Sequence, residues 1–309
     1  MNKLYVGVSP HLRAPRSTRA VMGDVLIALA PALAASVVLF GPRALLLTAV
    51  SAAACVLCEF VWEKLMHLPV TVGDLSAAVT GVLLAFNVPA SMPVWQLIVG
   101  DVAAIIVVKM LFGGLGRNFM NPALVGRIVL MFSFTGSMTS YPAPFAWRGA
   151  DAVSSATPLA QTGAWSWANS VHLFLGDHPG VLGETCVIAL ALGFVYLLVR
   201  RVIKPIIPLC YLGSLALFTW LFGGAQPLLS IFMGGAVLGA VFMATDYVTS
   251  PFTNWGKVIF GVGCGLITAA IRVFGNYAEG VTFAILLMNI LVPYINDWTR
   301  TKPLGGAAK

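Results

Sequence analysis

The stretch from residue 205 to residue 245 carries no charged side chain over 41 consecutive positions. A helix that spans a bilayer needs about 20 mostly apolar residues, so this stretch is long enough for two, and Gly-Gly-Ala-Gln-Pro at 223–227 supplies a turn between them. Charged residues make up only 9% of the whole chain, against about 25% in soluble domains. Since the outside of a soluble globule must be wetted, the sequence excludes a soluble enzyme and a nucleic-acid-binding chain. It predicts an all-α integral membrane protein embedded in a lipid bilayer.

Ten apolar segments of this kind occur along the 309 residues. They are 21–40, 43–62, 74–88, 95–112, 119–133, 182–200, 205–222, 228–245, 257–274 and 279–296. Segments 74–88 and 119–133 are short and lie beside Pro, Gly and Asn residues, which predicts broken or partial spans. The expected architecture is therefore about ten transmembrane helices, some of them short or broken.

The distribution of Lys and Arg predicts the orientation in the membrane. With a cytoplasmic N-terminus, 14 of the 18 basic residues face the cytoplasm and only Arg43, Arg148 and Arg272 lie outside, as the positive-inside rule requires. Arg127 is left within a span. The predicted parts outside the spans are a cytoplasmic N-terminal segment at 1–20, an external loop at 134–181 and a cytoplasmic C-terminal tail at 297–309.

An internal repeat is visible in the loops. The sequence at 84–95 resembles that at 243–255, and each follows a Gly-containing apolar helix. The repeating unit has five helices, an odd number, so the two copies, 21–133 and 182–296, must have opposite orientations in the membrane. Inverted repeats with interrupted helices are typical of transporters, whose sites lie near the midplane. The alternative is that Pro- and Ser-rich turns between apolar helices look alike by chance.

The segment 113–127 combines glycines with polar residues at the start of a predicted helix. Glycines let a backbone approach a ligand closely, and Asn121-Pro122 is a typical helix start, with Asn121 as the cap. Arg127 lies two turns further in, and an ionisable residue inside a span indicates function. A salt bridge from Arg127 to Glu59 or Asp101, or snorkelling to the interface, is the alternative.

Three further polar residues are candidates for an ion path. Asp101 lies inside the predicted fourth helix, Asp246 ends the eighth, and Asn87 occupies the equivalent place in the first repeat. Paired polar breaks at matching positions suit the passage of an ion, whereas helix capping and turn formation are the alternative. The sequence shows no metal-ligand spacing, no Ser/His/Asp triad and no phosphate-binding loop.

The predicted external loop contains Asp151-Ala-Val-Ser154-Ser155-Ala156-Thr157-Pro158. The proline favours an extended backbone at the preceding threonine, and an exposed hydroxyl in such a loop can be esterified. From the residues alone this signal is weak, because Ser/Thr/Pro loops are common.

Resemblance to a known family gives the loop more weight. Asp151, Ser154, Ala156 and Thr157 are similar to the flavinylation sequence of membrane subunits that carry covalent FMN. Further similar motifs are Ser9-Pro10-His11 with Met22, residues 113–127, 242–246 with 248–251, and 286–289 with Pro293. The family comprises the D-type subunit of the Rnf ion-translocating electron transport complex and its relative, the B-type subunit of the sodium-pumping NADH:quinone oxidoreductase. The length favours the Rnf branch.

The resemblance implies a redox-driven ion pump of the bacterial inner membrane. A flavin transferase would join FMN to the Thr157 hydroxyl as a phosphoester, and a second, noncovalent riboflavin would lie deeper in the bundle. Asn118, Asn121 and Arg127 of the 113–127 segment are possible flavin contacts. Electrons would pass between ferredoxin and NAD, coupled to Na⁺ or H⁺ translocation. The partners implied are subunits A, B, C, E and G, so the chain would be an electron-transfer subunit of a translocase and not catalytic alone.

Two positions depart from the family pattern. Ser155 stands where the flavinylation sequence often has Gly, and Tyr247 follows Asp246 where the family usually has Pro. Serine is small, so attachment at Thr157 should survive. The residues alone do not determine the type of turn that follows Asp246. The alternatives are the B-type subunit of the quinone-reducing sodium pump, a cofactor-free inverted-repeat transporter or channel, and a membrane scaffold without a cofactor.

Overall fold

A computed structural model describes residues 16–148, 170–223, 229–275 and 280–300. In these ranges every regular element is a helix or a helical turn, and there is no β-strand. Four helices are long and apolar enough to cross a membrane: α1 (Thr18–Phe40), α2 (Pro42–Leu65), α11 (Asn254–Phe274) and α12 (Val281–Trp298). The predicted class, an all-α membrane protein, is confirmed.

Four more predicted spans are shorter apolar helices. These are α3 (Ser76–Phe86), α5 (Pro122–Ser133), α8 (Val187–Val199) and α9 (Ile206–Leu221). The predicted fourth span consists of α4 (Val94–Val102), which runs directly into the π-helical segment η2 (Ala103–Met110). Between the halves lie the short elements α6 (Thr135–Met138), η3 (Ala146–Arg148) and α7 (Ser170–Leu175).

The segment 228–245, predicted as one helix, is broken. It consists of a 3₁₀ turn, η6 (Leu229–Phe232), the short helix α10 (Ala236–Leu238) and the π-helical η7 (Gly239–Met243). The break falls at Gly234 and Gly235, whose φ angles are 61° and 65°. A left-handed residue cannot continue a right-handed helix, so the apolar run does not form a single rod.

The same device precedes α3 in the first half. The 3₁₀ turn η1 (Val72–Asp74) ends at Leu75, whose φ is 67°, and α3 begins one residue later. Both halves therefore hold a 3₁₀ turn, a left-handed residue and a short buried helix in the same order. This parallel supports the repeat that the loop sequences suggested.

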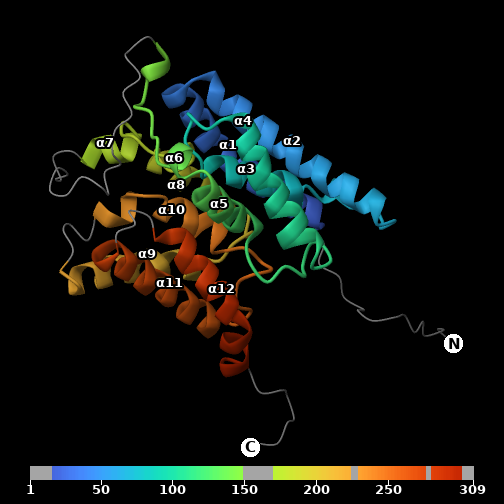
Figure 1. Cartoon of the computed structure of the whole chain (residues 1–309). Coiled ribbons are helices and arrows are strands. Elements are labelled where there is room, and N and C mark those ends of the chain that lie inside the picture. Colours follow the sequence, from blue (N-terminus) through green and yellow to red (C-terminus); the bar gives the residue numbers. More distant parts are fainter. Residues whose placement is uncertain (1–15, 149–169, 224–228, 276–279, 301–309) are drawn as a thin grey trace, which may run out of the picture.

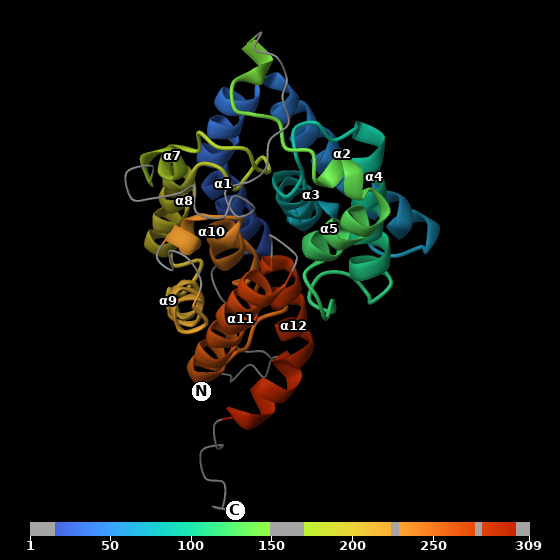
Figure 2. The same cartoon turned by 60° about the vertical axis from the view of Figure 1, so that its left-hand side comes forward.

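The helices pack in the same pairs in both halves. In the first, α2 contacts α3 and α4, and α5 contacts α3 and α4; in the second, α9 contacts η7 and α11, and α12 contacts η7 and α11. Figure 1 and Figure 2 show α2–α5 gathered on one side of the molecule and α9, α11 and α12 on the other. The halves are joined by contacts of α1 with α8 and of α5 with α12.

Small residues bring the central helices of each half together. A Cβ atom at Gly81 of α3 would lie 2.6 Å from the Ser51 carbonyl oxygen of α2. In the second half, Cβ atoms at Gly261 and Gly265 of α11 would collide with Cys210 and Ser214 of α9. The spacing of Gly261 and Gly265 is the small-xxx-small pattern that allows close approach of membrane helices.

Candidate functional site

The chain that leaves the C-terminal end of α3 packs against the second half near the centre of the protein. Asn87, the C-cap of α3, is 2% exposed, and its amide oxygen accepts a hydrogen bond of 2.9 Å from the Arg127 guanidinium of α5. The Asn87 amide nitrogen donates to the Leu83 carbonyl and lies 3.7 Å from the Met243 sulfur of η7. The structure therefore brings together two of the predicted site residues, Asn87 and Arg127.

Asn121 caps α5 as predicted. Its side-chain oxygen accepts hydrogen bonds from the backbone of Ala123 and Leu124, and Pro122 occupies the first helical position. The Asn121 amide nitrogen donates to the Met243 carbonyl across the boundary between the halves, at 3.3 Å. The cap of one half thus binds the end of the broken helix of the other.

Asn289, in the middle of α12, contacts this cap from the second half. In the amide orientation that satisfies both of its polar groups, Asn289 donates to the Thr249 carbonyl at 3.1 Å and accepts from the Asn121 backbone at 3.3 Å. This orientation is assigned from the hydrogen-bond pattern, as for any amide. Sequence analysis missed this contact, although Asn289 stood in one of the family motifs.

A cavity lies where α1, α3, the loop before α5 and the segment after η7 come together. It holds about 770 Å³ of empty space, a figure that includes its open mouth. Its polar lining includes Ser76, Lys109, Asn118, Asn121, Thr245 and Asp246. Its apolar lining includes Met22, Val25, Leu83, Val202 and Phe242. Three of the predicted site residues, Asn118, Asn121 and Asp246, therefore share one cavity.

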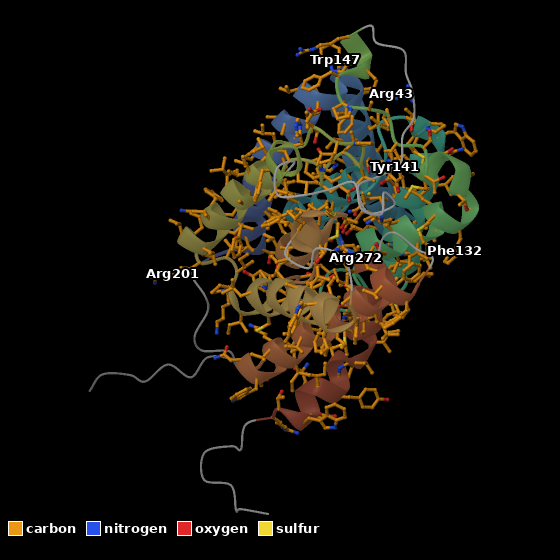
Figure 3. The ribbon with its side chains drawn as sticks, turned by 90° about the vertical axis from the view of Figure 1, so that its left-hand side faces the viewer. Arg43, Phe132, Tyr141, Trp147, Arg201 and Arg272 are labelled. Atoms are coloured by element: carbon orange, nitrogen blue, oxygen red, sulfur yellow. The ribbon has the colours of Figure 1, made fainter. Side chains whose placement is uncertain are left out.

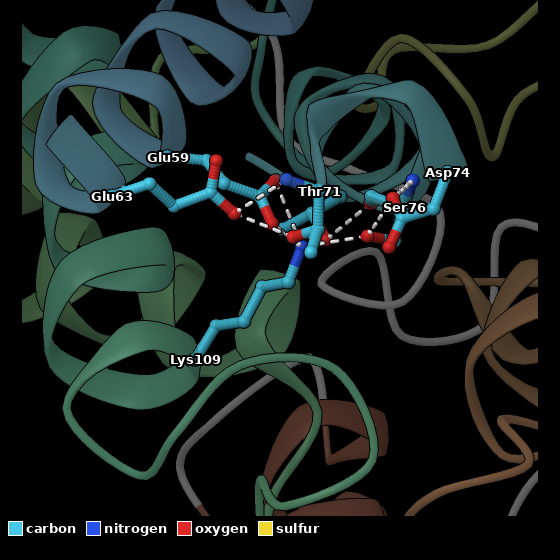
Figure 4. A network of polar contacts seen from close by, with 7 residues as sticks. Glu59, Glu63, Thr71, Asp74, Ser76 and Lys109 are labelled. Carbon is cyan, nitrogen blue, oxygen red and sulfur yellow. Dashed lines mark hydrogen bonds and ion pairs between the residues drawn. The ribbon is translucent and has the colours of Figure 1, made fainter. Parts of the chain in front are cut away.

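Lys109, one wall of this cavity, belongs to a buried polar network (Figure 4). Its ammonium group donates to both Glu59 carboxylate oxygens, at 2.8 and 2.9 Å, and to the Ser76 hydroxyl at 2.6 Å. All three ammonium hydrogens thus have acceptors. Glu59 and Lys109 are each 1% exposed, so the pair lies out of contact with solvent.

The network extends on both sides of the ion pair. The Ser76 hydroxyl is also 2.6 Å from an Asp74 carboxylate oxygen, which accepts from the Ser76 backbone as well. Glu63, one turn beyond Glu59 in α2, accepts from the backbone and hydroxyl of Thr71. Lys109 was not among the residues predicted for a site. The i, i+4 spacing of Glu59 and Glu63 on an apolar helix was the available signal of a polar stripe.

Asp101 lies in a separate place, against α2. It is 0% exposed, and one carboxylate oxygen accepts from the Ser51 hydroxyl at 2.6 Å and faces the Cys55 thiol at 3.3 Å. Among the described residues, the other oxygen has no hydrogen-bond partner. Glu59 pairs with Lys109 and Asp101 with the groups of α2, so neither of these two described carboxylates forms the ion pair with Arg127 that was the alternative.

Asp246 and Asn87 differ in their surroundings despite their equivalent positions. Asp246 accepts from the Thr249 hydroxyl at 3.0 Å and from the Val248 backbone at 3.4 Å. These are the contacts of a side chain that stabilises its own turn, the alternative considered for it. Asn87, by contrast, uses its side chain to bind another helix through Arg127.

Glu184 interacts electrostatically with both Arg127 and Arg272. It lies in the non-helical segment before α8, and that segment pairs with the end of α3 through a hydrogen bond from the Gly183 backbone to the Phe86 carbonyl, at 2.9 Å. Burial, together with the nearby Glu184, raises the pKa of Tyr141. Burial lowers the pKa of His178. Figure 3 shows Arg272 near the middle of the molecule and Tyr141 nearer its upper end.

The predicted attachment motif of Asp151, Ser154, Ser155, Ala156 and Thr157 lies outside the described residues. In the residues that the structure does describe, no group of three or more His, Cys, Asp or Glu side chains is arranged to hold a metal ion. The structure thus supports contacts around the cavity and the Asn87–Arg127 pair, and it leaves the attachment motif as a prediction.

These features define a class: an all-helical, multi-pass membrane protein whose two similar halves share a largely apolar cavity with a few polar side chains in its lining. Comparison with known proteins then gives the family. Residues 5–305 match the model of the NQR2, RnfD, RnfE family. The chain belongs to this family.

Three curated relatives match the chain over nearly its full length. It is 45% identical to the D-type subunit of the Na⁺-translocating ferredoxin:NAD⁺ oxidoreductase complex of Acetobacterium woodii, covering 99% of this chain and 97% of that protein. It is 38% identical to the D-type subunit of the proton-translocating ferredoxin:NAD⁺ oxidoreductase complex of Clostridium ljungdahlii, with 98% and 97% covered. It is 36% identical to the D-type subunit of the ion-translocating oxidoreductase complex of Halorhodospira halophila, with 99% and 96% covered.

Proposed function

We propose that this chain is the D-type membrane subunit of an Rnf ion-translocating ferredoxin:NAD⁺ oxidoreductase. The observation that carries the proposal is the full-length similarity to subunits of that name, at up to 45% identity in the comparisons above. Such a chain transfers electrons within a multisubunit translocase and has no complete reaction of its own. Its partners would be subunits A, B, C, E and G.

The first proposed cofactor is FMN, joined as a phosphoester to Thr157 by a flavin transferase. The motif of Asp151, Ser154, Ser155, Ala156 and Thr157 supports it. FMN accepts one or two electrons, so it can link one-electron carriers with two-electron carriers. The chain's own part is to hold the cofactor on the external side, where the charge distribution places the 134–181 loop.

The second proposed cofactor is a noncovalent riboflavin in the cavity between the halves. The lining of the cavity, which is apolar with a few polar side chains, fits a flavin in chemistry. Apolar side chains such as Val25 and Phe242 would cover the ring, and Asn118 and Asn121 offer polar groups to its edge. Arg127 does not line this cavity. We therefore propose that it does not contact the flavin directly but holds Asn87 in place where the two halves meet.

The coupling ion is Na⁺ or H⁺, since one relative is named for each. Asp101, which has a buried oxygen without a partner among the described residues, is the first choice of a group on the ion path. Asn87 and Asp246 remain candidates, although the turn contacts of Asp246 give it a structural task.

The proposed setting is the bacterial inner membrane, with both termini in the cytoplasm. The placement of two basic residues is consistent with this orientation, because Arg43 lies beside Trp147 at one end of the molecule, whereas Arg201 lies at its side, well apart from them (Figure 3). Arg43 belongs to the few predicted external basic residues and Arg201 to the cytoplasmic majority.

Covalent flavin separates this function from a cofactor-free transporter. The full chain, produced together with a flavin transferase, should give a fluorescent band on a denaturing gel, and Thr157→Ala should abolish it. Thr162→Ala, five residues away and outside the motif, is the matched control and should keep the signal. A wild-type chain without flavin would refute the FMN proposal and favour the transporter.

A further inference from the structure

The chain just before residue 149 is fixed to the corner between α1 and α2. The Phe145 backbone donates to the Leu39 carbonyl at 2.7 Å, and the Trp147 indole donates to the Val38 carbonyl at 3.4 Å. The indole lies over Gly41, the residue between the two helices, where a Cβ atom would be 2.7 Å from the ring. Gly41 has a φ of 81°, so both its conformation and this contact require glycine.

A surface cavity opens beside this corner. It holds about 800 Å³ of empty space, including its open side, and its lining includes Phe40, Pro42, Arg43, Ser91 and Trp147. Trp147 is 48% exposed, so part of its ring is available to a ligand. The cavity is separate from the one between the halves, because the two share no lining residue.

The Arg43 guanidinium lines this cavity, and a second guanidinium, that of Arg148, lies outside the lining against the neighbouring aromatic rings. Arg43 uses one nitrogen to donate to the Ser91 and Met92 carbonyls, at 3.3 and 3.1 Å, and is otherwise exposed. The Arg148 guanidinium lies 5.1 Å from the centres of both the Phe145 and Trp147 rings. The site thus offers an aromatic wall with cations at its rim, which suits a planar aromatic anion.

We propose that this cavity, which we call the corner pocket, binds the isoalloxazine ring of the FMN carried by Thr157. The inference rests on the proposed function. Thr157 is nine residues beyond Arg148, and nine residues reach at most about 30 Å, so the tether allows the ring to return to the corner. The Trp147 indole would stack on the ring, and Arg43 would interact with its anionic reduced form.

The test uses the quenching of flavin fluorescence by a stacked indole, which donates an electron to the excited ring. The flavinylated full chain in detergent is compared before and after denaturation, so that native fluorescence is normalised to covalent flavin. Trp147→Phe keeps an aromatic ring over Gly41 but removes the indole. Trp298→Phe, at the exposed end of α12, is the matched control.

The proposal predicts a several-fold rise in normalised native fluorescence for Trp147→Phe and no change for Trp298→Phe. It also predicts that Arg43→Gln shifts the midpoint potential of the covalent FMN to more negative values, because the reduced anion loses a cation. Equal fluorescence in the wild type and Trp147→Phe, with flavin in the denatured band, would overturn the pocket alone. A denatured band without flavin would overturn the proposed function together with the pocket.

Discussion

The two helix breaks are alike in backbone and different in chemistry. Before α3, Lys109 reaches the break from the end of the fourth span and binds Ser76, with Glu59 as its counter-ion. Before α10, Arg272 reaches the break from the end of α11 and donates to the carbonyls of Ser230, Met233 and Gly234, at 2.6–3.1 Å. A basic side chain at an equivalent helix end thus secures each break.

The difference follows from the two side chains. Arginine has five donors in a rigid fork, so it can satisfy several carbonyls of a 3₁₀ turn at once, whereas lysine is a compact charge that needs a carboxylate when buried. The first half therefore contains a buried ion pair, and the second relies on backbone acceptors. The lesson is that one architectural requirement, holding a broken helix, has two solutions with different vulnerabilities.

Removal of the counter-ion should have the largest effect. Glu59→Ala leaves the Lys109 ammonium buried without a carboxylate, and breaking a buried pair in this way costs about 3–5 kcal/mol. The free energy of unfolding in detergent, measured by denaturant titration, should fall by that amount.

The double variant Glu59→Leu/Lys109→Met is the control for this prediction. It removes both charges, and replacing a buried pair with apolar residues is often neutral or stabilising, so most of the lost stability should return. If the double variant is no more stable than Glu59→Ala, the account of the first break fails.

A smaller loss is expected at the second break. Arg272→Lys keeps the charge but cannot reach all three carbonyls, and each buried polar group left without a partner costs about 1–3 kcal/mol. The same denaturant titration measures the change. Lys109→Arg is the reciprocal exchange at the first break. If Arg272→Lys is as stable as the wild type, the several donors of the Arg272 guanidinium are unimportant at the second break.

The smallest effect concerns the left-handed residues themselves. Gly235→Ala should cost about 1–2 kcal/mol because of its positive φ, and its Cβ would also lie 2.9 Å from a Glu184 oxygen. Leu75→Gly should change little, since relief of backbone strain offsets the greater freedom of the unfolded chain. Thermal unfolding of the two variants compares them directly; equal losses would contradict the distinction.

Much of the fold follows from the sequence, because span length and local capping depend on nearby residues. The apolar lengths of α1, α2, α11 and α12 and the cap at Asn121-Pro122 needed no tertiary information. The short α3 and α5 were expected from their Pro, Gly and Asn neighbours. These features confirm that hydrophobic length is the strongest signal in such a chain.

The break at Gly234 and Gly235 was missed, because an uncharged run gives no sign of where a helix stops. The Glu59–Lys109–Ser76 network was missed for another reason: its members come from three separate segments, and only packing brings them together. Local patterns predict which residues are polar and buried, but partners depend on the tertiary fold.

The central claim, an electron-transfer subunit with covalent FMN, is tested most directly by the mass of the peptide that contains Thr157. The chain is isolated from cells that also produce a flavin transferase and is then digested. The account predicts that this peptide carries the added mass of FMN less one water, with fragment ions that locate it on Thr157. An unmodified peptide from a chain produced with an active transferase would contradict it.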